Sequence, residues 1–513
     1  MFHLTKISIG NLISKLLKPK IHLLLLFFSL LLAIALRAQE TLSKNYLFLI
    51  DQGRDMLGVK GIVFDHHLTL IGPYTSLGGV FQGPIYYYLL SIFTFLSKGD
   101  PWTSVLCMLL ISIATLLVVY VFMSKFFGKT TALITLFLFC ISPEAVAAAT
   151  YSWNPHPMWL IITTYIFLTY LTISKSPKYH LFLWPVLALS FHFQAALGVF
   201  LSLGTFLYFI IFERKNLISK NFFLGLLFGL VFFLPQIIFD LRHNFLMSSS
   251  VVDAILGNDR GLFFGKEGTT FNRISDHLSA FYSNYLTSFH YGNLFKKTSQ
   301  IVLYMTGFIL VFSRFNKIFN KNEKRFINLL LTLIFFIFGA TLLYPFPIRY
   351  WHLTGFQSFY LLLVGVVFGR TVNYKIGKTL LLVFAIISLI YSYQRLDYIY
   401  LNPPNDGGLA KIKGKIAALD YIYLDAKDQE FNLLVFTPPV NTDAYDYLVW
   451  WYGQKKYGFL PTKEKKGLTY LLMEPDPSKP WSYNGWLETV IVNGDVIKTV
   501  NLPSGLIIQK RIF

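Results

Sequence analysis

The chain contains 513 residues, of which 54% are hydrophobic and only 14% are charged, and its mean hydropathy is +0.53. Ordinary globular proteins are about a quarter charged, so this composition excludes a soluble globular particle and predicts a polytopic membrane protein. The two cysteines, Cys107 and Cys140, lie in apolar runs and provide neither a disulfide framework nor a CxxC metal site. The net charge of +19 has to be interpreted from its distribution along the chain.

About eleven apolar runs have the length expected of membrane-spanning helices, roughly 17 to 25 residues. These runs are 21–36, 102–123, 130–149, 157–174, 180–194, 195–212, 221–239, 298–313, 326–344, 353–369 and 379–393. The first run follows Lys6, Lys15, Lys18 and Lys20, and a cleaved signal peptide is the competing interpretation. We expect an uncleaved anchor, because several spans follow and an acidic motif comes directly after this run.

Lysine and arginine near span ends remain on the cytoplasmic side of a membrane. With the N-terminus inside, the predicted inner segments hold 19 cations and two acids, whereas the short outer turns at 143–157 and 345–352 hold one cation, Arg349. This distribution requires that residues 84–96 do not cross the membrane. A helix of that length reaches only about 20 Å, short of a hydrocarbon core of roughly 30 Å. We therefore expect an interfacial or re-entrant helix at 84–96. Because membrane topology accounts for most of the excess of cations, we expect no nucleic-acid partner.

The predicted topology leaves four regions outside the membrane. They are residues 37–100, a turn at 152–157, residues 240–297 and the tail from 401. The tail differs in composition, with 13 cations and 12 acids, and its pattern predicts a helix and four strands. We expect the helix at 410–425 and the strands at 432–436, 468–473, 489–492 and 506–508. The predicted organisation is an all-α polytopic membrane domain at 1–400 and a small extracytoplasmic α/β domain at 401–513.

The first outer region begins with Asp51-Gln52-Gly53-Arg54-Asp55, directly after an apolar segment. If this segment is helical, its two carboxylates lie on one face. A carboxylate beside an arginine at the membrane surface can act as a general base for a hydroxyl group. An exposed salt bridge in a loop is the alternative, and the spacing alone favours it.

Two further motifs place polar side chains at the outer ends of spans. One runs from Gly78 to Leu90, with Pro84 suited to start a helix, and the other runs from Tyr151 to Pro157. Their polar members, together with a histidine at the next outer crossing, are Gln82, Tyr86, Asn154, His156 and His192. Each motif alone fits an ordinary turn or a packing residue. Several polar clusters at one rim of a membrane protein favour a functional site.

The last outer turn contains Arg349, Tyr350 and His352. Arg349 departs from the positive-inside trend, and a guanidinium group pairs well with phosphate oxygens. A snorkelling arginine in an aromatic belt is the alternative.

The order of these motifs resembles that of the GT-C glycosyltransferases, and most closely that of the protein O-mannosyltransferases and the bacterial aminoarabinose transferases that modify lipid A. The resemblance covers about residues 20–395 and is strongest at 46–160. It rests on the acidic motif at Asp51, the helix start at Gly83-Pro84-Ile85-Tyr86, the Asn154-Pro155 turn and the distal Arg349-Tyr350. Where the family commonly has charged residues, this chain has Gln52, Gln82 and Asn154.

The resemblance implies transfer of a sugar from a polyprenyl-phosphate donor to a glycan, lipid or protein acceptor at the outer face of the plasma membrane, with inversion and with Asp51 as the base. We expect Arg349, helped by His352 or His192, to contact the donor phosphate. The remaining expected binding residues are Arg54, Asp55, Gln82, Tyr86, Asn154, His156 and Tyr350. The motifs leave a divalent-metal requirement open.

A nucleotide-sugar donor is not expected, because the chain has no Gly-rich phosphate loop of the P-loop or dinucleotide kind. The main alternative function is a membrane transporter or flippase for a lipid-linked or small polar substrate. Transporters place polar residues near the bilayer midplane, often within internal repeats. Here the polar clusters lie at the outer ends of spans and no internal repeat is visible, which favours the enzyme.

Overall fold

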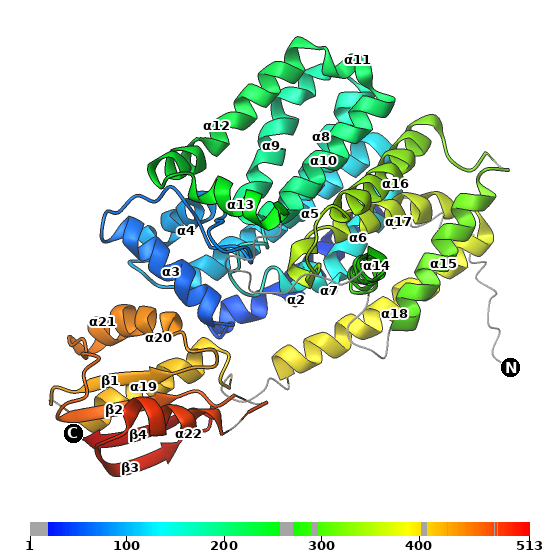
Figure 1. Cartoon of the computed structure of the whole chain (residues 1–513). Coiled ribbons are helices and arrows are strands. Elements are labelled where there is room, and N and C mark those ends of the chain that lie inside the picture. The colour runs from blue at the N-terminus through cyan, green and yellow to red at the C-terminus, as the bar shows by residue number, and fades with distance from the viewer. Residues whose placement is uncertain are drawn as a thin grey trace, which may run out of the picture.

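The computed structural model describes residues 19–256, 270–289, 296–315, 317–401, 408–427, 429–476, 478–479 and 481–513. Within these ranges a large helical bundle is joined to a smaller C-terminal lobe that contains the sheet (Figure 1). This architecture confirms the predicted fold class. Three of the four N-terminal lysines, part of the outer segment 240–297 and the residues just after the predicted domain boundary lie outside the described residues.

Six helices of the described chain are long and apolar enough to cross a membrane. They are α2 (Pro19–Ser43), α5 (Trp102–Phe127), α10 (Ala195–Phe212), α12 (Lys220–Arg242), α16 (Lys321–Thr341) and α18 (Lys375–Leu396). Shorter apolar helices are α4 (Ile85–Leu96), α6 (Lys129–Ile141), α8 (Met158–Ser174) and α17 (Gln357–Thr371). Two more coincide with predicted runs, α9 (His180–Phe193) and α15 (Lys296–Phe312). The chain is a multi-pass membrane protein, and the number of eleven spans stays a prediction.

Two expected segments are divided differently in the structure. The run 130–149 is not one helix, because α6 ends at Ile141 and Pro143 begins the short α7 (Pro143–Ala147). A proline is favoured at a helix start and cannot continue the preceding helix. The region 37–100 is not one loop either. It contains the end of α2, then α3 (Ile50–Val63) and α4.

Arg37, expected at the start of the outer loop, lies instead within α2 and is fully buried. Its guanidinium donates hydrogen bonds to the carbonyl oxygens of Cys140 (2.7 Å) and Phe139 (2.8 Å) and to the Ser112 hydroxyl (3.0 Å). The last carbonyl groups of a helix have no partner within the helix. Arg37 therefore satisfies the end of α6, and this need explains why a charged side chain is buried there.

The remaining helices lie between or beside the long ones. They are α11 (Arg214–Leu217), α13 (Leu246–Leu256), α14 (Thr270–Leu286) and the 3₁₀ turns η1 (Pro177–Tyr179) and η3 (Tyr350–Leu353). A π-helical turn, η4 (Asp397–Leu401), follows α18.

The C-terminal lobe contains a four-stranded sheet and helices on both of its faces. The strands are β1 (Asn432–Phe436), β2 (Leu468–Met473), β3 (Asp495–Asn501) and β4 (Ile507–Ile512), in the order β1-β2-β4-β3. β1 and β2 are parallel and the other pairs are antiparallel. The helices are α19 (Ile412–Ala426), α20 (Asp443–Leu448), η5 (Val449–Gly453), α21 (Gln454–Tyr457), α22 (Ser482–Trp486) and η6 (Leu487–Ile491).

Most of the elements predicted in the tail are present, but one predicted strand is not formed. The predicted helix and the first two predicted strands correspond to α19, β1 and β2, and β4 overlaps the last predicted strand. Residues 489–492 belong instead to η6 and its end, where Ile491 is buried among apolar residues beneath the sheet. The strand missed by the prediction, β3, is an edge strand exposed on both faces. It therefore lacks the alternation that marks a half-buried strand.

Candidate active site

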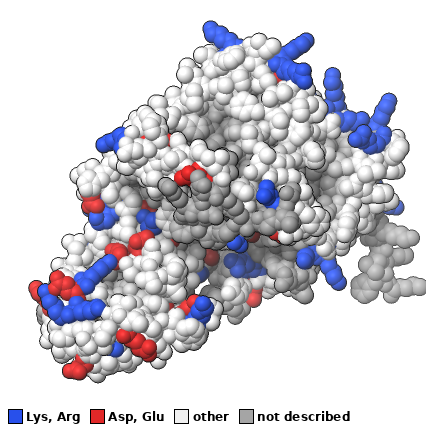
Figure 2. Space-filling view, in the orientation of Figure 1, with Lys and Arg blue, Asp and Glu red and all other residues white. Residues whose placement is uncertain are grey.

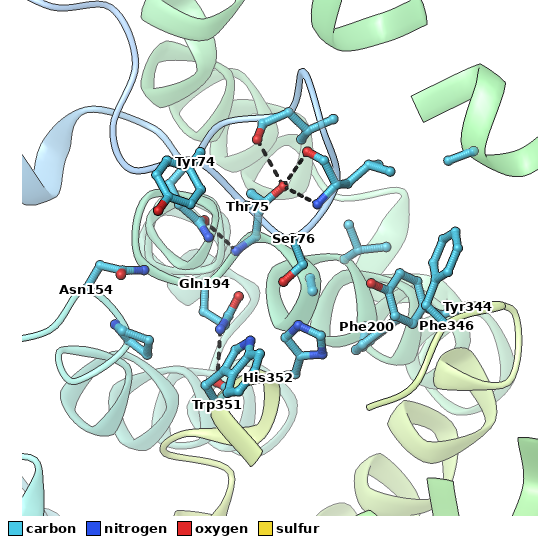
Figure 3. Close-up of a pocket in the computed structure, with 18 of the residues that line it drawn as sticks. Tyr74, Thr75, Ser76, Asn154, Gln194, Phe200, Tyr344, Phe346, Trp351 and His352 are labelled. Carbon is cyan, nitrogen blue, oxygen red and sulfur yellow. Dashed lines mark hydrogen bonds between the residues drawn. The ribbon is translucent and has the colours of Figure 1, made fainter. Parts of the chain in front are cut away.

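A cavity of about 760 Å³ lies among α3, the loop that precedes α4, the start of α10, α13 and the turn before α17. Figure 3 shows polar and aromatic side chains from the loop before α4, the turn before α8, α10 and the turn before α17 arranged around one space. Six of the predicted site residues line the cavity: Asp51, Arg54, Gln82, Asn154, Tyr350 and His352. Among the described residues, the other five predicted ones are not in its lining: Asp55, Tyr86, His156, His192 and Arg349.

Asp51 occupies the second position of α3 and presents its carboxylate to the cavity. Its Oδ1 lies 2.9 Å from Nη1 of Arg54, and its Oδ2 accepts a hydrogen bond of 3.0 Å from the indole Nε1 of Trp153. The Asp51 side chain nevertheless stays 40% exposed. Two fixed partners hold the carboxylate in one orientation, and the open side leaves room for a substrate hydroxyl.

Arg54 lies between Asp51 and Asp55 and is largely buried. Its Nη2 is 2.8 Å from Oδ1 of Asp55, and its guanidinium lies 4.6 Å from the centre of the Tyr74 ring. Asp55 is buried and also accepts a long hydrogen bond of 3.4 Å from the Tyr87 hydroxyl. Burial raises the pKa of Asp55 to about 6, although Arg54 opposes that shift.

The predicted helical arrangement of the two carboxylates is thus present, with Arg54 between them. The expected exposed salt bridge is replaced by a partly buried one.

Three amide side chains at the polar end of the cavity are each tied on one side to a backbone group. Gln82 Oε1 accepts from the amide nitrogen of Ala195 (2.7 Å), Asn154 Nδ2 donates to the carbonyl of Phe193 (2.8 Å), and Gln194 Nε2 donates to the carbonyl of Trp351 (2.9 Å). Figure 3 shows Asn154 and Gln194 pointing toward the shared space. Their fixed orientation leaves one donor and two acceptor groups suited to hydroxyls.

Three predicted site residues support the cavity from behind. The Tyr86 hydroxyl lies 2.9 Å from the Ser152 hydroxyl, His156 Nδ1 lies 2.9 Å from the carbonyl of Tyr151, and His192 Nε2 lies 3.0 Å from the carbonyl of Phe232. All three side chains are buried. Burial lowers the pKa of His156 to about 3, so this ring is neutral at physiological pH.

The turn before α17 contributes Tyr350, Trp351 and His352 to the cavity. His352 Nδ1 lies 3.3 Å from the backbone nitrogen of Arg349, and burial together with Arg349 lowers the pKa of His352 to about 4. Helix α14 holds this turn from outside, since Asn284 Nδ2 donates to the carbonyl of Leu353 (3.1 Å). The side chain of His277 lies 3.2 Å from the carbonyl of Phe346 in the same way.

The opposite end of the cavity is apolar. Its walls come from α10, from the end of α16 and from α13. The residues are Ala195, Ala196, Val199, Phe200, Leu203, Ala340, Leu343, Val251 and Ala254. Leu203 and Val199 are also partly exposed. The cavity therefore combines polar side chains with an apolar wall.

Several residues at the site were not predicted. Trp153 and Tyr74 line the cavity, and Gln52 supports it. Gln194, which the sequence pairs with His192 as a polar point at the same outer crossing, was not assigned a role there and also lines the cavity. The buried Gln52 amide donates to the carbonyl of Ser152 (2.9 Å), while its Oε1 accepts from the backbone of Leu49. Gln52 lies at a helix start beside Asp51, and this signal could have indicated it. The part of the chain that the structure describes has no group of three or more His, Cys, Asp or Glu residues placed to hold a metal ion.

The chain is similar to known proteins both in sequence and in structure. A family model described as dolichyl-phosphate-mannose-protein mannosyltransferase matches residues 82–239, which include Gln82, Asn154 and Gln194. ArnT from Cupriavidus metallidurans, solved with undecaprenyl phosphate bound, superposes with a TM-score of 0.59 at 10% identity over 95% of this chain and 97% of that one. The chain has the GT-C fold. It resembles the mannosyltransferase and ArnT proteins, as the order of its motifs predicted.

A second solved protein is similar to a smaller degree. The oligosaccharyltransferase of Archaeoglobus fulgidus, tethered to an acceptor peptide, gives a TM-score of 0.45 at 13% identity over 84% of this chain and 63% of that chain. The chain thus spans less than two thirds of that protein. No curated protein sequence matches the chain.

The raised pKa of Asp55 leads to a prediction about stability. An ordinary aspartate has a pKa of about 3.9, so the folded protein holds a proton on Asp55 more tightly than the unfolded chain does. The stabilisation from that proton is present below about pH 4 and is lost as the pH rises through about 6. Relative to Asp55→Asn, the free energy of unfolding of the wild-type protein should fall by about 2 kcal/mol between pH 4 and pH 7.

Thermal or denaturant unfolding of both proteins in detergent, at several pH values, measures this difference. The neutral histidines are common to both proteins and cancel in the comparison. Parallel stability curves for wild type and Asp55→Asn over this pH range would show that Asp55 titrates normally.

Proposed function

We propose that the protein is a glycosyltransferase that moves a sugar from a polyprenyl-phosphate-linked donor to an acceptor, with inversion and with Asp51 as the general base. The observation that carries this proposal is the cavity itself, whose lining combines Asp51 and other polar side chains with an apolar wall from α10 and the end of α16. A sugar phosphate attached to a long hydrocarbon chain has the same division between a polar and an apolar part.

Two observations from the comparisons support the nature of the donor. The family model that matches residues 82–239 describes enzymes that use a dolichyl-phosphate sugar. ArnT, which shares the fold along nearly the whole chain, was solved with undecaprenyl phosphate bound. Both lipids belong to the polyprenyl phosphates.

The reaction needs one base and one stabilised leaving group. The acceptor oxygen forms a bond to the anomeric carbon while the bond from that carbon to the phosphate oxygen breaks. The acceptor proton passes to Asp51, and the polyprenyl phosphate leaves with the electron pair. Asp51 is the one Asp or Glu in the cavity lining, and its open side faces the cavity. The aromatic rings of Trp153 and Tyr350, with centres 6.1 Å apart, border the same end and offer apolar faces to a sugar ring.

The donor phosphate requires a cation. Arg54 lines the cavity but is already paired with two carboxylates. We assign the phosphate contact to Arg349, which lies between Phe346 and Tyr350, both of them in the cavity lining. The neighbouring His352 is neutral, because burial and Arg349 lower its pKa to about 4, so it would act as a hydrogen-bonding group there.

The orientation in the membrane follows from charge. Figure 2 shows lysine and arginine side chains gathered at the upper and right edges of the molecule, away from the C-terminal lobe. Exposed cations at the helix ends there include Lys215, Lys220, Lys317 and Lys321. Because such residues favour the cytoplasmic side, we place the N-terminus in the cytoplasm. The cavity and the C-terminal domain then lie on the extracytoplasmic face of the plasma membrane, where a glycan, lipid or protein acceptor is available.

The role of Asp51 gives the central prediction. Asp51→Asn keeps the size of the side chain but removes its capacity to take a proton, so transfer from a polyprenyl-phosphate sugar should fall at least about 100-fold. Asp65→Asn is the matched control, because Asp65 is an exposed carboxylate just after the same helix, paired with Lys60. The measurement is the rate of polyprenyl phosphate release by the purified proteins.

If Asp51→Asn kept the wild-type rate while remaining folded, Asp51 would not be the base. The natural sugar and acceptor can be found by mass spectrometry of envelope glycans and glycolipids in cells with and without the protein.

The role of Arg349 gives a separate prediction. Arg349→Ala removes a charge-assisted contact to phosphate and should raise the KM for the donor about tenfold, with a smaller change in kcat. Arg314→Ala, at an exposed helix end remote from the cavity, should leave both constants unchanged. If the donor KM were unaltered in Arg349→Ala, Arg349 would not contact the phosphate and would instead be a snorkelling arginine in an aromatic belt.

A further inference from the structure

We infer that the C-terminal domain is a positioning element of the transfer site, because it fixes the helix that carries Asp51 and Arg54. This inference rests on the proposed function, in which Asp51 is the base. It concerns the contacts of α3 with residues that lie more than 350 positions later in the chain. Figure 1 shows the lobe containing α20 next to α3.

The first contact is a short backbone pairing directly before α3. The backbone nitrogen of Phe48 donates to the carbonyl of Ala410 (2.9 Å), and that of Ile412 donates to the carbonyl of Tyr46 (3.0 Å). Leu47 and Lys411 form the antiparallel bridge between these two bonds. Since α3 begins at Ile50, this pairing fixes the point at which the helix starts, one residue before Asp51.

The second contact is a close approach of two helices at Gly53. A Cβ atom built on Gly53 would lie 2.2 Å from the backbone nitrogen of Ala444 and 2.4 Å from its Cα. Two residues along an α-helix rotate the side-chain direction by about 200°, so Gly53 faces away from Asp51. One side of α3 therefore carries the cavity carboxylate, and the other side rests on the backbone of α20.

A shared apolar core joins the same two parts. Phe48 and Met56 from the α3 region are buried in one cluster with Tyr447 and Leu448 from α20. The Tyr447 hydroxyl also donates to the carbonyl of Gly99, at 2.7 Å, in the turn before α5. At the far end of α3, the Phe64 ring lies 5.0 Å from that of Trp450. The helix is thus in contact with the C-terminal domain from its start to its end.

Helix α20 is itself fixed within the C-terminal domain by a buried charged group. Lys415 Nζ, on α19, lies 2.7 Å from Oε2 of Glu474, at the end of β2. The Tyr445 hydroxyl, on α20, donates to the same oxygen (2.9 Å). Lys415 is only 1% exposed, so this group ties α19, α20 and the sheet together. A displacement of α20 would have to break it.

These contacts make the activity depend on the docked position of the domain. In catalysis, a misplacement of about 1 Å can reduce the rate roughly 100-fold. A methyl group on Gly53 would require a shift of that order, because the atoms it meets belong to the backbone of α20 and cannot rotate away. The apolar walls of the cavity on α10 and α16 lie outside this contact, so donor binding should be less affected than turnover.

The full-length protein offers a matched pair of variants on one helix. Gly53→Ala meets the backbone of α20, whereas an added Cβ at Gly61 meets nothing within 4 Å. Both changes have the same intrinsic effect on helix propensity. We expect Gly53→Ala to lower kcat at least tenfold while the donor KM changes less than threefold, and Gly61→Ala to keep both constants within twofold of wild type.

Variants on the opposite side of the contact keep the test independent of α3. Ala444 is 4% exposed and belongs to the apolar cluster that contains Phe48 and Met56, so Ala444→Val should displace α3 and reproduce the loss of kcat, and Ala444→Ser should do so more weakly. Ile497→Thr, on the exposed face of β3, is the control within that domain and should have no effect.

Wild-type kcat in folded Gly53→Ala and Ala444→Val would overturn the inference and leave the proposed function standing. If Gly53→Ala did not fold, wild-type kcat in folded Ala444→Val would overturn it equally. Loss of kcat accompanied by an equal rise in donor KM in each variant would also overturn it, because general destabilisation would then explain the loss. Absence of transfer by the wild-type protein and Gly61→Ala would instead refute the proposed function.

Discussion

The pairing of Arg54 with two carboxylates is the interaction on which the rest of the site depends. Arg54 is only 13% exposed, and Asp51 and Asp55 contact different edges of its guanidinium group. Loss of Arg54 would leave the buried Asp55 carboxylate without its cation, which is strongly unfavourable. The pairing therefore keeps Asp55 in the interior and directs Asp51 outward, where its open side meets the cavity. The ring of Tyr74 and the hydroxyl of Tyr87 complete the enclosure.

The neutral amides in this chain have a structural explanation. Gln52 and Asn154 stand where the resemblance drawn from the motif order leads one to expect acids, and each donates a hydrogen bond to a backbone carbonyl, of Ser152 and of Phe193 respectively. An ionised carboxylate accepts hydrogen bonds but cannot donate them, so an acid at either position would face a carbonyl oxygen. These amides connect the turn between α7 and α8 to α3 and to α9, and they hold the polar end of the cavity together.

The sequence predicted the parts of the structure that depend on local pattern. Apolar runs identified the membrane helices, and Asp51, Arg54, Gln82, Asn154, Tyr350 and His352 were expected at the site and do line one cavity. Tyr86, His156 and His192 were expected to bind substrate, but they do not line the cavity, and their hydrogen bonds go to Ser152 and to backbone carbonyls. A polar residue at the end of a span carries no local signal that tells a ligand contact from a support.

The remaining features depend on contacts between distant segments. Nothing in the sequence around Gly53 indicates that α20 will lie against it, and Arg37 looks like an ordinary residue at the end of a span until Phe139 and Cys140 are brought beside it. The prediction missed strand β3 because this strand has no buried face, and so its sequence carries no alternation of apolar and polar residues. The roles assigned to individual site residues remain proposals that the variants above address.

The most direct test of the proposed donor is a structure of the protein in a lipid nanodisc with undecaprenyl phosphate. We expect the phosphate at the polar end of the cavity, within reach of Arg349 and near Asp51, and the prenyl chain along the apolar walls of α10 and α16. A lipid bound elsewhere on the bundle, with the region between Asp51 and His352 empty at saturating concentration, would contradict the assignment of this cavity as the donor site.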